Sequence, residues 1–167
     1  MEEKQFDTDA IKEWLNDYRE TERDIDNQVE RLDRLDMQMT SISSPVITDM
    51  PRNPSPVYDR AAAVVAKKVD LENEIREAIQ SQKRKRELIE DILKHLRSSD
   101  ERGVIRIRYL DRASWYEVTD VLFGGREDYL NKEETYLRRV HKIHGSALQH
   151  IAQYVSEHPN SEIPSVL

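Results

Sequence analysis

The chain has 167 residues, of which 37% are hydrophobic and 35% are charged, and its formal net charge is −7. A compact globule usually contains about 45–50% apolar residues, so this composition favours long solvated helices in one domain, or a small domain with an appendage. The absence of cysteine excludes disulfides, thiol catalysis and thiolate metal sites. No apolar run approaches ~18–20 residues and the acidic N-terminus lacks an apolar stretch, so we expect a cytoplasmic protein without a membrane span or secretion signal.

The charge is distributed unevenly along the chain. Residues 1–40 carry 6 Lys or Arg against 13 Asp or Glu, whereas residues 102–154 carry 9 against 7. The acidic character therefore comes from the N-terminal segment. An acidic protein normally disfavours nucleic acid, but the charge of the local binding face matters more than the sum.

Residues 8–40 are predicted to form one long helix with a coiled-coil-like seam. Apolar side chains recur every seven residues, and further apolar residues widen the stripe. Glu22 and Asp36 interrupt the second track of the seam, so the helix offers a partner an imperfect surface. The apolar residues of the stripe are Ile11, Leu15, Tyr18, Ile25, Val29, Leu32, Leu35 and Met39.

A proline-rich linker and a second long helix follow. Residues 41–57 contain four prolines, which remove backbone donors and restrict the preceding residues, so we predict no helix there. The second helix is predicted to begin near residues 57–60 and to reach about Arg97, as one helix or as two that meet near Ser81. Residues 1–97 would then form a helical hairpin within one chain or a coiled coil between chains, and we favour a homodimer.

The last part of the chain, residues 88–155, has the layout of a helix-turn-helix domain. Candidate capping boxes mark the starts of three helices, and an apolar platform would support the last of them, from Lys132 to about Val155. Residues 156–167 would form a flexible tail. The candidate boxes are Ser98 with Glu101, Ser114 with Glu117, and Asn131 with Glu134. The platform residues are Ile105, Tyr109, Leu110, Val118, Val121 and Leu122. The expected fold is therefore all-α, a long hairpin or coiled coil followed by a helix-turn-helix.

The last helix is predicted to have an apolar side and a basic side. Its apolar side would pack Leu137, Val140, Ile143, Ala147, Leu148 and Ile151 on the platform. The other side suits the major groove of DNA, because Arg binds guanine edges or phosphates, and Tyr and Thr contact phosphate or a thymine methyl. The residues on that side are Lys132, Thr135, Tyr136, Arg138, Arg139, His141 and Lys142.

Parts of the sequence resemble known transcription proteins. Residues 102–123, RGVIRIRYLDRASWYEVTDVLF, resemble the R-x-V-I-x-L-R-Y and S-x-x-E-I-A pattern of sigma factor region 4, and residues 141–151 resemble the end of its recognition helix. With residues 51–60 and 136–148 included, the chain resembles the RinA/ArpU/LtrC-like group of phage late transcription regulators. This resemblance implies a sequence-specific activator of phage or mobile-element late genes that binds double-stranded promoter DNA in a bacterial host. Host RNA polymerase would be a further partner, with the acidic N-terminal segment as a candidate contact surface.

The resemblance also assigns the DNA contacts. Residues 136–142 fall where region 4 contacts bases and phosphates, and Arg138 and Arg139 are the leading candidates. Further cations near the preceding turn would hold the DNA backbone, and these are Arg106, Arg108 and Arg112.

One departure from region 4 concerns the connection between its two helices. Region 4 has a tight turn there, whereas this chain inserts about ten residues at 124–133. Arg126 and Lys132 of the insertion are candidates for DNA contact. The insertion and the residue after it also carry the acidic pairs 127–128 and 133–134, which would repel phosphate unless they point elsewhere.

Two other functions fit parts of the sequence. A small terminase-like DNA-packaging protein also combines a helix-turn-helix with an oligomerising helix, and a ring of eight or more subunits would identify it. A protein-binding module without DNA affinity would fit the acidic balance. An enzyme is not expected, because the chain has no Gly-rich phosphate loop, nucleophile elbow or HExxH. We expect no cofactor and no metal, since His141 and His144 lack the further ligands of a metal motif.

Overall fold

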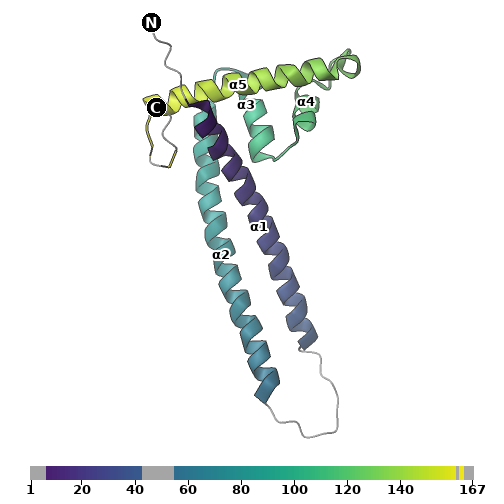
Figure 1. Ribbon diagram of the computed structural model, residues 1–167, viewed down its shortest axis with the longest axis vertical. Coiled ribbons are helices and arrows are strands. Elements are labelled where there is room, and N and C mark those ends of the chain that lie inside the picture. Colours follow the sequence, from purple (N-terminus) through teal and green to yellow (C-terminus); the bar gives the residue numbers. More distant parts are fainter. Residues whose placement is uncertain (1–6, 43–54, 161, 164–167) are drawn as a thin grey trace. The chain divides into compact units, whose positions relative to one another are not determined.

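The computed structural model describes residues 7–42, 55–160 and 162–163, and within these residues the fold is all-α, as predicted (Figure 1). Two long helices come first and a group of shorter elements follows. The elements are α1 (Thr8–Ile42), α2 (Ser55–Lys94), α3 (Ser99–Ile105), a π-helical turn η1 (Arg106–Leu110), α4 (Trp115–Phe123), a 3₁₀ turn η2 (Tyr129–Asn131) and α5 (Glu133–Glu157).

The chain divides into two compact units. Residues 21–83 form one of them, called the hairpin unit below, and residues 1–20 with 84–167 form the other, called the head unit. This division differs from the expected arm of residues 1–97, because both long helices contribute to both units. Ile11, Leu15 and Tyr18 at the start of α1 are buried in the core of the head unit, together with Ile89 and Leu93 from the end of α2.

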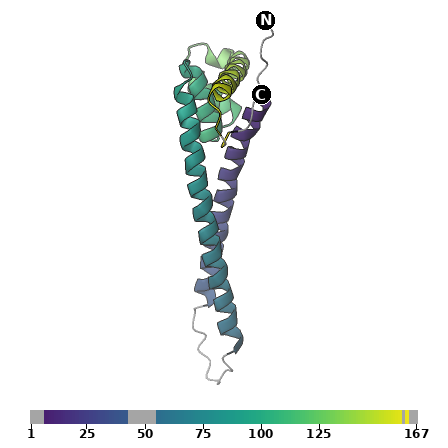
Figure 2. The same cartoon turned by 90° about the vertical axis from the view of Figure 1, so that its left-hand side faces the viewer.

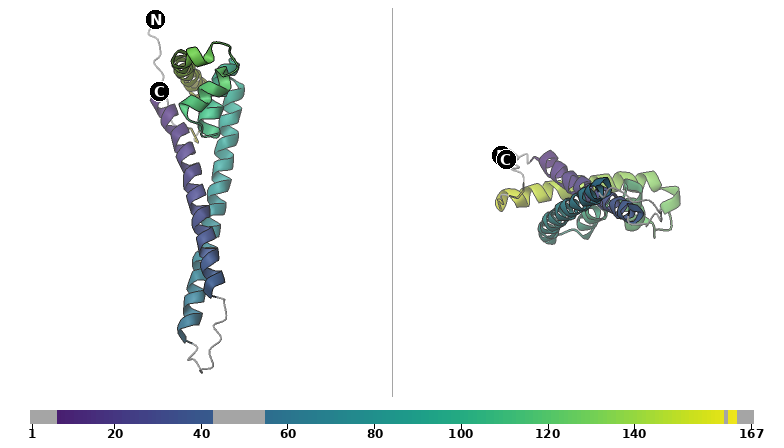
Figure 3. Two further views of the ribbon diagram at one scale, coloured as in Figure 1. Left: turned by 90° about the vertical axis from the view of Figure 1, so that its right-hand side faces the viewer. Right: turned by 90° about the horizontal axis from the view of Figure 1, so that it is seen from below.

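In the hairpin unit, α1 and α2 pair within one chain and run antiparallel (Figure 2; Figure 3). Asp36 pairs with Lys68 and Glu22 with Gln82, so residues late in α1 meet residues early in α2. Ile25, Leu71 and Ile75 are buried in this seam. Within the described residues the two helices therefore pair inside one chain, whereas the homodimer stays a prediction. The structure also shows α2 as one helix that continues through Ser81.

The polar residues that interrupt the predicted seam have partners across the hairpin. The Asp36 carboxylate lies 2.6 Å from the Lys68 ammonium group, and Lys68 also pairs with Glu72 at 3.6 Å. The Gln82 side-chain amide, which is buried, donates a hydrogen bond of 3.4 Å to the Glu22 carboxylate. A polar residue in an apolar seam specifies register when its partner is opposite it. These interruptions therefore fix how α1 and α2 align.

The head unit contains two apolar clusters. The first joins the start of α1, the end of α2, α3, η1 and the C-terminal half of α5. The second lies between α3, α4, η2 and the first turns of α5, where Val104, Val118, Phe123, Tyr129 and Val140 are buried. Most of the predicted platform is confirmed, since Ile105, Tyr109, Leu110 and Val118 are buried and Leu122 is half-buried. Val121 was predicted wrongly, because it lies on the outward face of α4 with 66% of its surface exposed.

The capping predictions have three different outcomes. At α4 both reciprocal hydrogen bonds of the Ser114–Glu117 box form. Ser98 caps α3 by accepting from the Glu101 backbone, but the Glu101 carboxylate instead bonds Ser146 and His150 on α5. The third box is wrong: α5 begins at Glu133 without a side-chain cap, because Asn131 belongs to η2.

The expected termini of the elements also change. α1 ends at Ile42 and α2 begins at Ser55, so part of the predicted linker 41–57 is helical, while residues 43–54 lie outside the described residues. The predicted flexible tail, 156–167, is partly packed. α5 continues to Glu157, and Ile163 is buried in the first cluster of the head unit.

Candidate nucleic-acid interface

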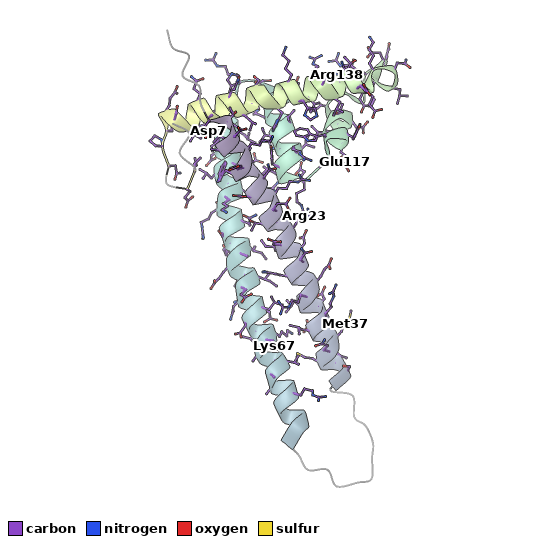
Figure 4. All side chains as sticks on the ribbon, viewed as in Figure 1. Asp7, Arg23, Met37, Lys67, Glu117 and Arg138 are labelled. Atoms are coloured by element: carbon purple, nitrogen blue, oxygen red, sulfur yellow. The ribbon has the colours of Figure 1, made fainter. Side chains whose placement is uncertain are left out.

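Helix α5 has one buried face and one exposed face. Val140, Ala147 and Ile151 are buried, and the helix packs on α3 and α4. Thr135, Arg138 and Lys142 are exposed, and their spacing of three and four residues places them on one stripe opposite the buried residues. Arg138 lies on the side of α5 that faces away from α3 and α4 (Figure 4). The predicted apolar packing is confirmed for Val140, Ala147, Leu148 and Ile151, whereas Leu137 and Ile143 are only half-buried. The contact of this helix with DNA stays a prediction.

Arg138 makes only a weak intramolecular contact. Its guanidinium lies 3.3 Å from the Glu134 carboxylate one turn earlier, and the two side chains are 79% and 86% exposed. Exposed i,i+4 ion pairs are easily exchanged for other partners because water and salt screen them. Arg138 is therefore available to an external anion, and Glu134 is the acidic residue nearest to it that such an anion must displace.

The outer stripe of α5 continues beyond the predicted residues. Gly145 and Gln149 follow Lys142 at the same spacing, and Gln149 is exposed. A Cβ added to Gly145 would meet no atom within 4 Å, so no close packing inside the protein requires a glycine there. A mid-helix glycine costs roughly 1 kcal/mol relative to alanine. Neither residue was predicted from the sequence, although the spacing continued from Arg138 leads to both of them.

Two cations that are distant in sequence meet at Phe123, the last residue of α4. The guanidinium carbon of Arg139 lies 5.1 Å from the centre of the Phe123 ring, and that of Arg126 lies 5.9 Å from it. Tyr136 stacks on the same ring with a centroid distance of 5.1 Å. Arg126 of the insertion and Arg139 of α5 therefore both lie near the Phe123 ring.

Asp128 from the insertion is neutralised by its neighbours. The Tyr136 hydroxyl donates to one carboxylate oxygen at 2.7 Å, and the Lys132 ammonium lies 2.8 Å from the other. These hydrogen bonds from Lys132 and Tyr136 lower the pKa of Asp128, and the carboxylate in turn raises the pKa of Lys132. Two predicted DNA contacts, Lys132 and Tyr136, are consequently paired with an acidic residue in this structure.

Arg108, Trp115 and His141 form a stack beside α5. The Arg108 guanidinium lies 4.5 Å from the centre of the Trp115 ring, and the His141 ring lies 4.5 Å from that ring in a tilted arrangement. Arg108 also donates a 2.7 Å hydrogen bond to the Ala113 carbonyl, and burial lowers its pKa. Arg108 is therefore held in place, while His141 is exposed at the edge of the stack.

The two remaining predicted cations precede α4. Arg106 makes a double hydrogen bond to the Glu90 carboxylate, with N–O distances of 3.1 and 2.6 Å, and this pairing lowers the pKa of Glu90. Arg112 is exposed at the corner between η1 and α4, where its φ of 61° places the backbone in the left-handed region. Arg106 would have to exchange Glu90 for phosphate if it bound DNA.

A buried hydrogen bond between Tyr109 and His144 supports the base of this region. The Tyr109 hydroxyl lies 2.9 Å from His144 Nε2, and both side chains are buried. Burial, assisted by the nearby positive charges of Lys12 and Arg108, lowers the pKa of His144 to about 4, while burial raises the pKa of Tyr109 to about 12. At neutral pH the imidazole is therefore neutral and shares a hydrogen bond with the tyrosine hydroxyl, an arrangement that the sequence did not suggest.

His141 is exposed and His144 is buried, and both rings lie against the Trp115 ring, with centroid distances of 4.5 and 4.9 Å. Within the described ranges no group of three or more His, Asp or Glu side chains could hold a metal ion. None of the helices, over the residues that are placed, is both long and apolar enough to cross a bilayer.

Comparisons with known proteins give one result. No curated protein and no solved structure matches the chain. Residues 52–141, more than half of the chain, match a family described as Protein of unknown function (DUF1492). The matched segment contains all of α2, α3 and α4 and the first turns of α5, and it ends just before Lys142. The chain therefore belongs to the DUF1492 family.

Proposed function

We propose that the protein is a sequence-specific DNA-binding transcription regulator and that α5 enters the major groove of double-stranded promoter DNA. The observation that carries this proposal is the exposed stripe of Thr135, Arg138 and Lys142 on a helix whose other face is buried on α3 and α4. A helix held from behind presents its donors in a fixed pattern, which direct readout of base edges requires. Gly145 on the same stripe lets a duplex backbone approach α5 closely.

The surroundings of the stripe support the same orientation. Arg126 and Arg139 converge at Phe123 and would provide phosphate contacts beside the groove. Asp128, one of the carboxylates that would repel phosphate, is compensated by Lys132 and Tyr136. Phosphate contacts supply most of the affinity of such complexes, and two or three base contacts supply about 1–3 kcal/mol of discrimination each.

The more specific part of the proposal is that the protein activates late genes of phages or mobile elements, with host RNA polymerase as its partner. Its support is the resemblance of residues 102–123 to sigma factor region 4, and of the chain to the RinA/ArpU/LtrC-like group. The same residues form α3, η1 and α4, which carry α5.

The test compares two double variants, each of which removes one Arg and one Lys from a different helix. Selection from a random duplex library with the wild-type chain would define the DNA, and fluorescence anisotropy would measure binding to the selected site. Arg138→Ala with Lys142→Ala is expected to weaken binding at least tenfold and to reduce the slope of log K against log salt by up to about 2. Arg60→Ala with Lys67→Ala, two exposed cations of α2, is the matched control and should leave affinity unchanged.

Either of two results would overturn the proposal. The first is a wild-type chain that enriches no sequence from the library. The second is an Arg138→Ala, Lys142→Ala variant that binds the selected site as tightly as the wild type while circular dichroism shows unchanged helix content.

A further inference from the structure

The outward face of α4 lines an open groove of about 730 Å³ in the head unit. Four lining residues, Tyr116, Glu117, Asp120 and Val121, come from α4, where the spacings of three and four residues among them place them on one side of the helix. Ile107 of η1 and Asp111, the residue after η1, form one wall, and the segment around η2 forms the other wall. The groove is separate from the outer stripe of α5, none of whose residues lines it.

The floor and edges of this groove expose apolar side chains. Val121 is 66% exposed, Tyr116 61% and Leu130 88%. These three are all of the large exposed hydrophobic side chains in the described part of the head unit. Apolar side chains gathered in one concave place and bordered by polar residues mark an interaction site, whereas isolated ones do not.

The groove is also acidic. Asp111, Glu117, Asp120 and Glu133 line it, and the described residues that line it include no Lys, Arg or His. Glu117 is fixed there as an anion, because the Ser114 backbone donates a 2.6 Å hydrogen bond that lowers its pKa. Asp120 and Glu133 have no side-chain hydrogen bond or ion pair among the described residues, and their charges add to burial in raising the pKa of Tyr129.

We propose that this groove docks a cationic amphipathic helix of a partner protein, with apolar side chains against Val121, Tyr116 and Leu130 and with Lys or Arg beside Asp120 and Glu133. An apolar stripe in a groove is a common way to bind a helix, and complementary charge selects the partner and speeds its association. Nucleic acid and anionic membrane surfaces are disfavoured, because both would place negative charge against these carboxylates. The inference concerns a different surface from the proposed DNA interface and does not depend on it.

The experiment uses the full chain and three labelled peptides of about 14 residues. One has an apolar Leu stripe with Lys on the remaining positions, one has Glu in place of Lys, and one has the Leu and Lys residues in scrambled order. Fluorescence anisotropy measures affinity, and two-dimensional NMR locates the contact. We expect the Leu/Lys peptide to bind at least tenfold more tightly than the other two, with shifts confined to α4, η1 and η2.

Two variants keep the proposal falsifiable. Val121→Asp and Leu130→Asp alter exposed side chains, so the fold should be retained, and each should weaken the Leu/Lys peptide at least tenfold. Val69→Asp, at an exposed valine of the hairpin unit, is the matched control and should have no effect. Equal binding of the Leu/Glu peptide, unchanged binding by Val121→Asp, or shifts on the outer stripe of α5 would each overturn the proposal. So would self-association of the wild type that Val121→Asp abolishes, since a second copy would then occupy the groove.

Discussion

Acidification should destabilise the head unit through His144. The imidazole is 7% exposed and shares a hydrogen bond with the Tyr109 hydroxyl, and its burial holds it in the neutral form. Its pKa of about 4 lies below the ordinary value of 6.5 that it regains on unfolding. Between these two values the unfolded chain binds the proton and the folded chain does not. The contribution of His144 to the free energy of unfolding is therefore fully present above about pH 6.5, and it is lost as the pH falls towards 4.

The size of this effect follows from the two pKa values. A group whose pKa is 6.5 in the unfolded chain and about 4 in the folded chain lowers the free energy of unfolding by about 2.5 kcal/mol at about pH 4.5. That is a large part of the stability of a small domain, which is typically about 5–15 kcal/mol. Below about pH 4 the folded protein also binds the proton, and this group causes no further loss.

Urea unfolding followed by tryptophan fluorescence measures the effect, because both tryptophans, Trp14 and Trp115, belong to the head unit. The wild type and His144→Gln would be compared between about pH 7.5 and pH 4.5. A glutamine can donate or accept a hydrogen bond with Tyr109 but does not titrate, so the stability of this variant should change by about 2.5 kcal/mol less over this interval. His141→Gln removes an exposed imidazole from the same helix and should follow the wild type. If the curves of the wild type and His144→Gln run parallel, the reasoning about the buried imidazole is wrong.

Three further predictions concern individual contacts. Gly145→Ala should stabilise the chain by up to about 1 kcal/mol in thermal unfolding, because the site is helical and open, whereas Gly124→Ala should destabilise it, since a Cβ there would lie 2.5 Å from the Asp120 carbonyl oxygen. Ser146→Ala removes the 2.6 Å hydrogen bond to the buried Glu101 carboxylate and should cost about 1–3 kcal/mol in urea unfolding. Ser156→Ala loses only a hydrogen bond within its own helix and should cost far less. Equal losses in the two variants would contradict the role of Glu101. Ser114→Ala should cost about 1 kcal/mol by removing the cap of α4, and an unchanged melting temperature would contradict this.

The periodic parts of the fold could be predicted from the sequence. The seven-residue repeat located α1, and the apolar spacing of α5 identified its buried face, because helical spacing determines which residues share a side. The capping box at Ser114 was readable because both of its residues act within four positions of the chain. These are local signals that do not depend on the neighbouring elements.

The errors come from contacts between segments that are distant in sequence. Val121 matches the apolar spacing of α4, but α3 and α5 determine which side of that helix is buried. The sequence around Val121 does not indicate where these two helices pack. Glu101 is placed correctly for a capping box, yet its carboxylate turns to Ser146 and His150, 45 and 49 residues away. The same limit applies to the candidate interface. The stripe of α5 was predictable, whereas the meeting of Arg126 with Arg139 at Phe123 depends on the fold of the insertion.

The cross-helix pairs of the hairpin unit make a register shift between α1 and α2 unfavourable. If α2 moved by one heptad along α1 in one direction, Glu22 would come to lie opposite Ile75, and in the other direction Asp36 would do so. Ile75 is buried, so either slide would force a carboxylate against an apolar side chain and would separate both native pairs. The two residues that weaken the apolar repeat thus leave the helices a single alignment that satisfies both the apolar and the charged side chains.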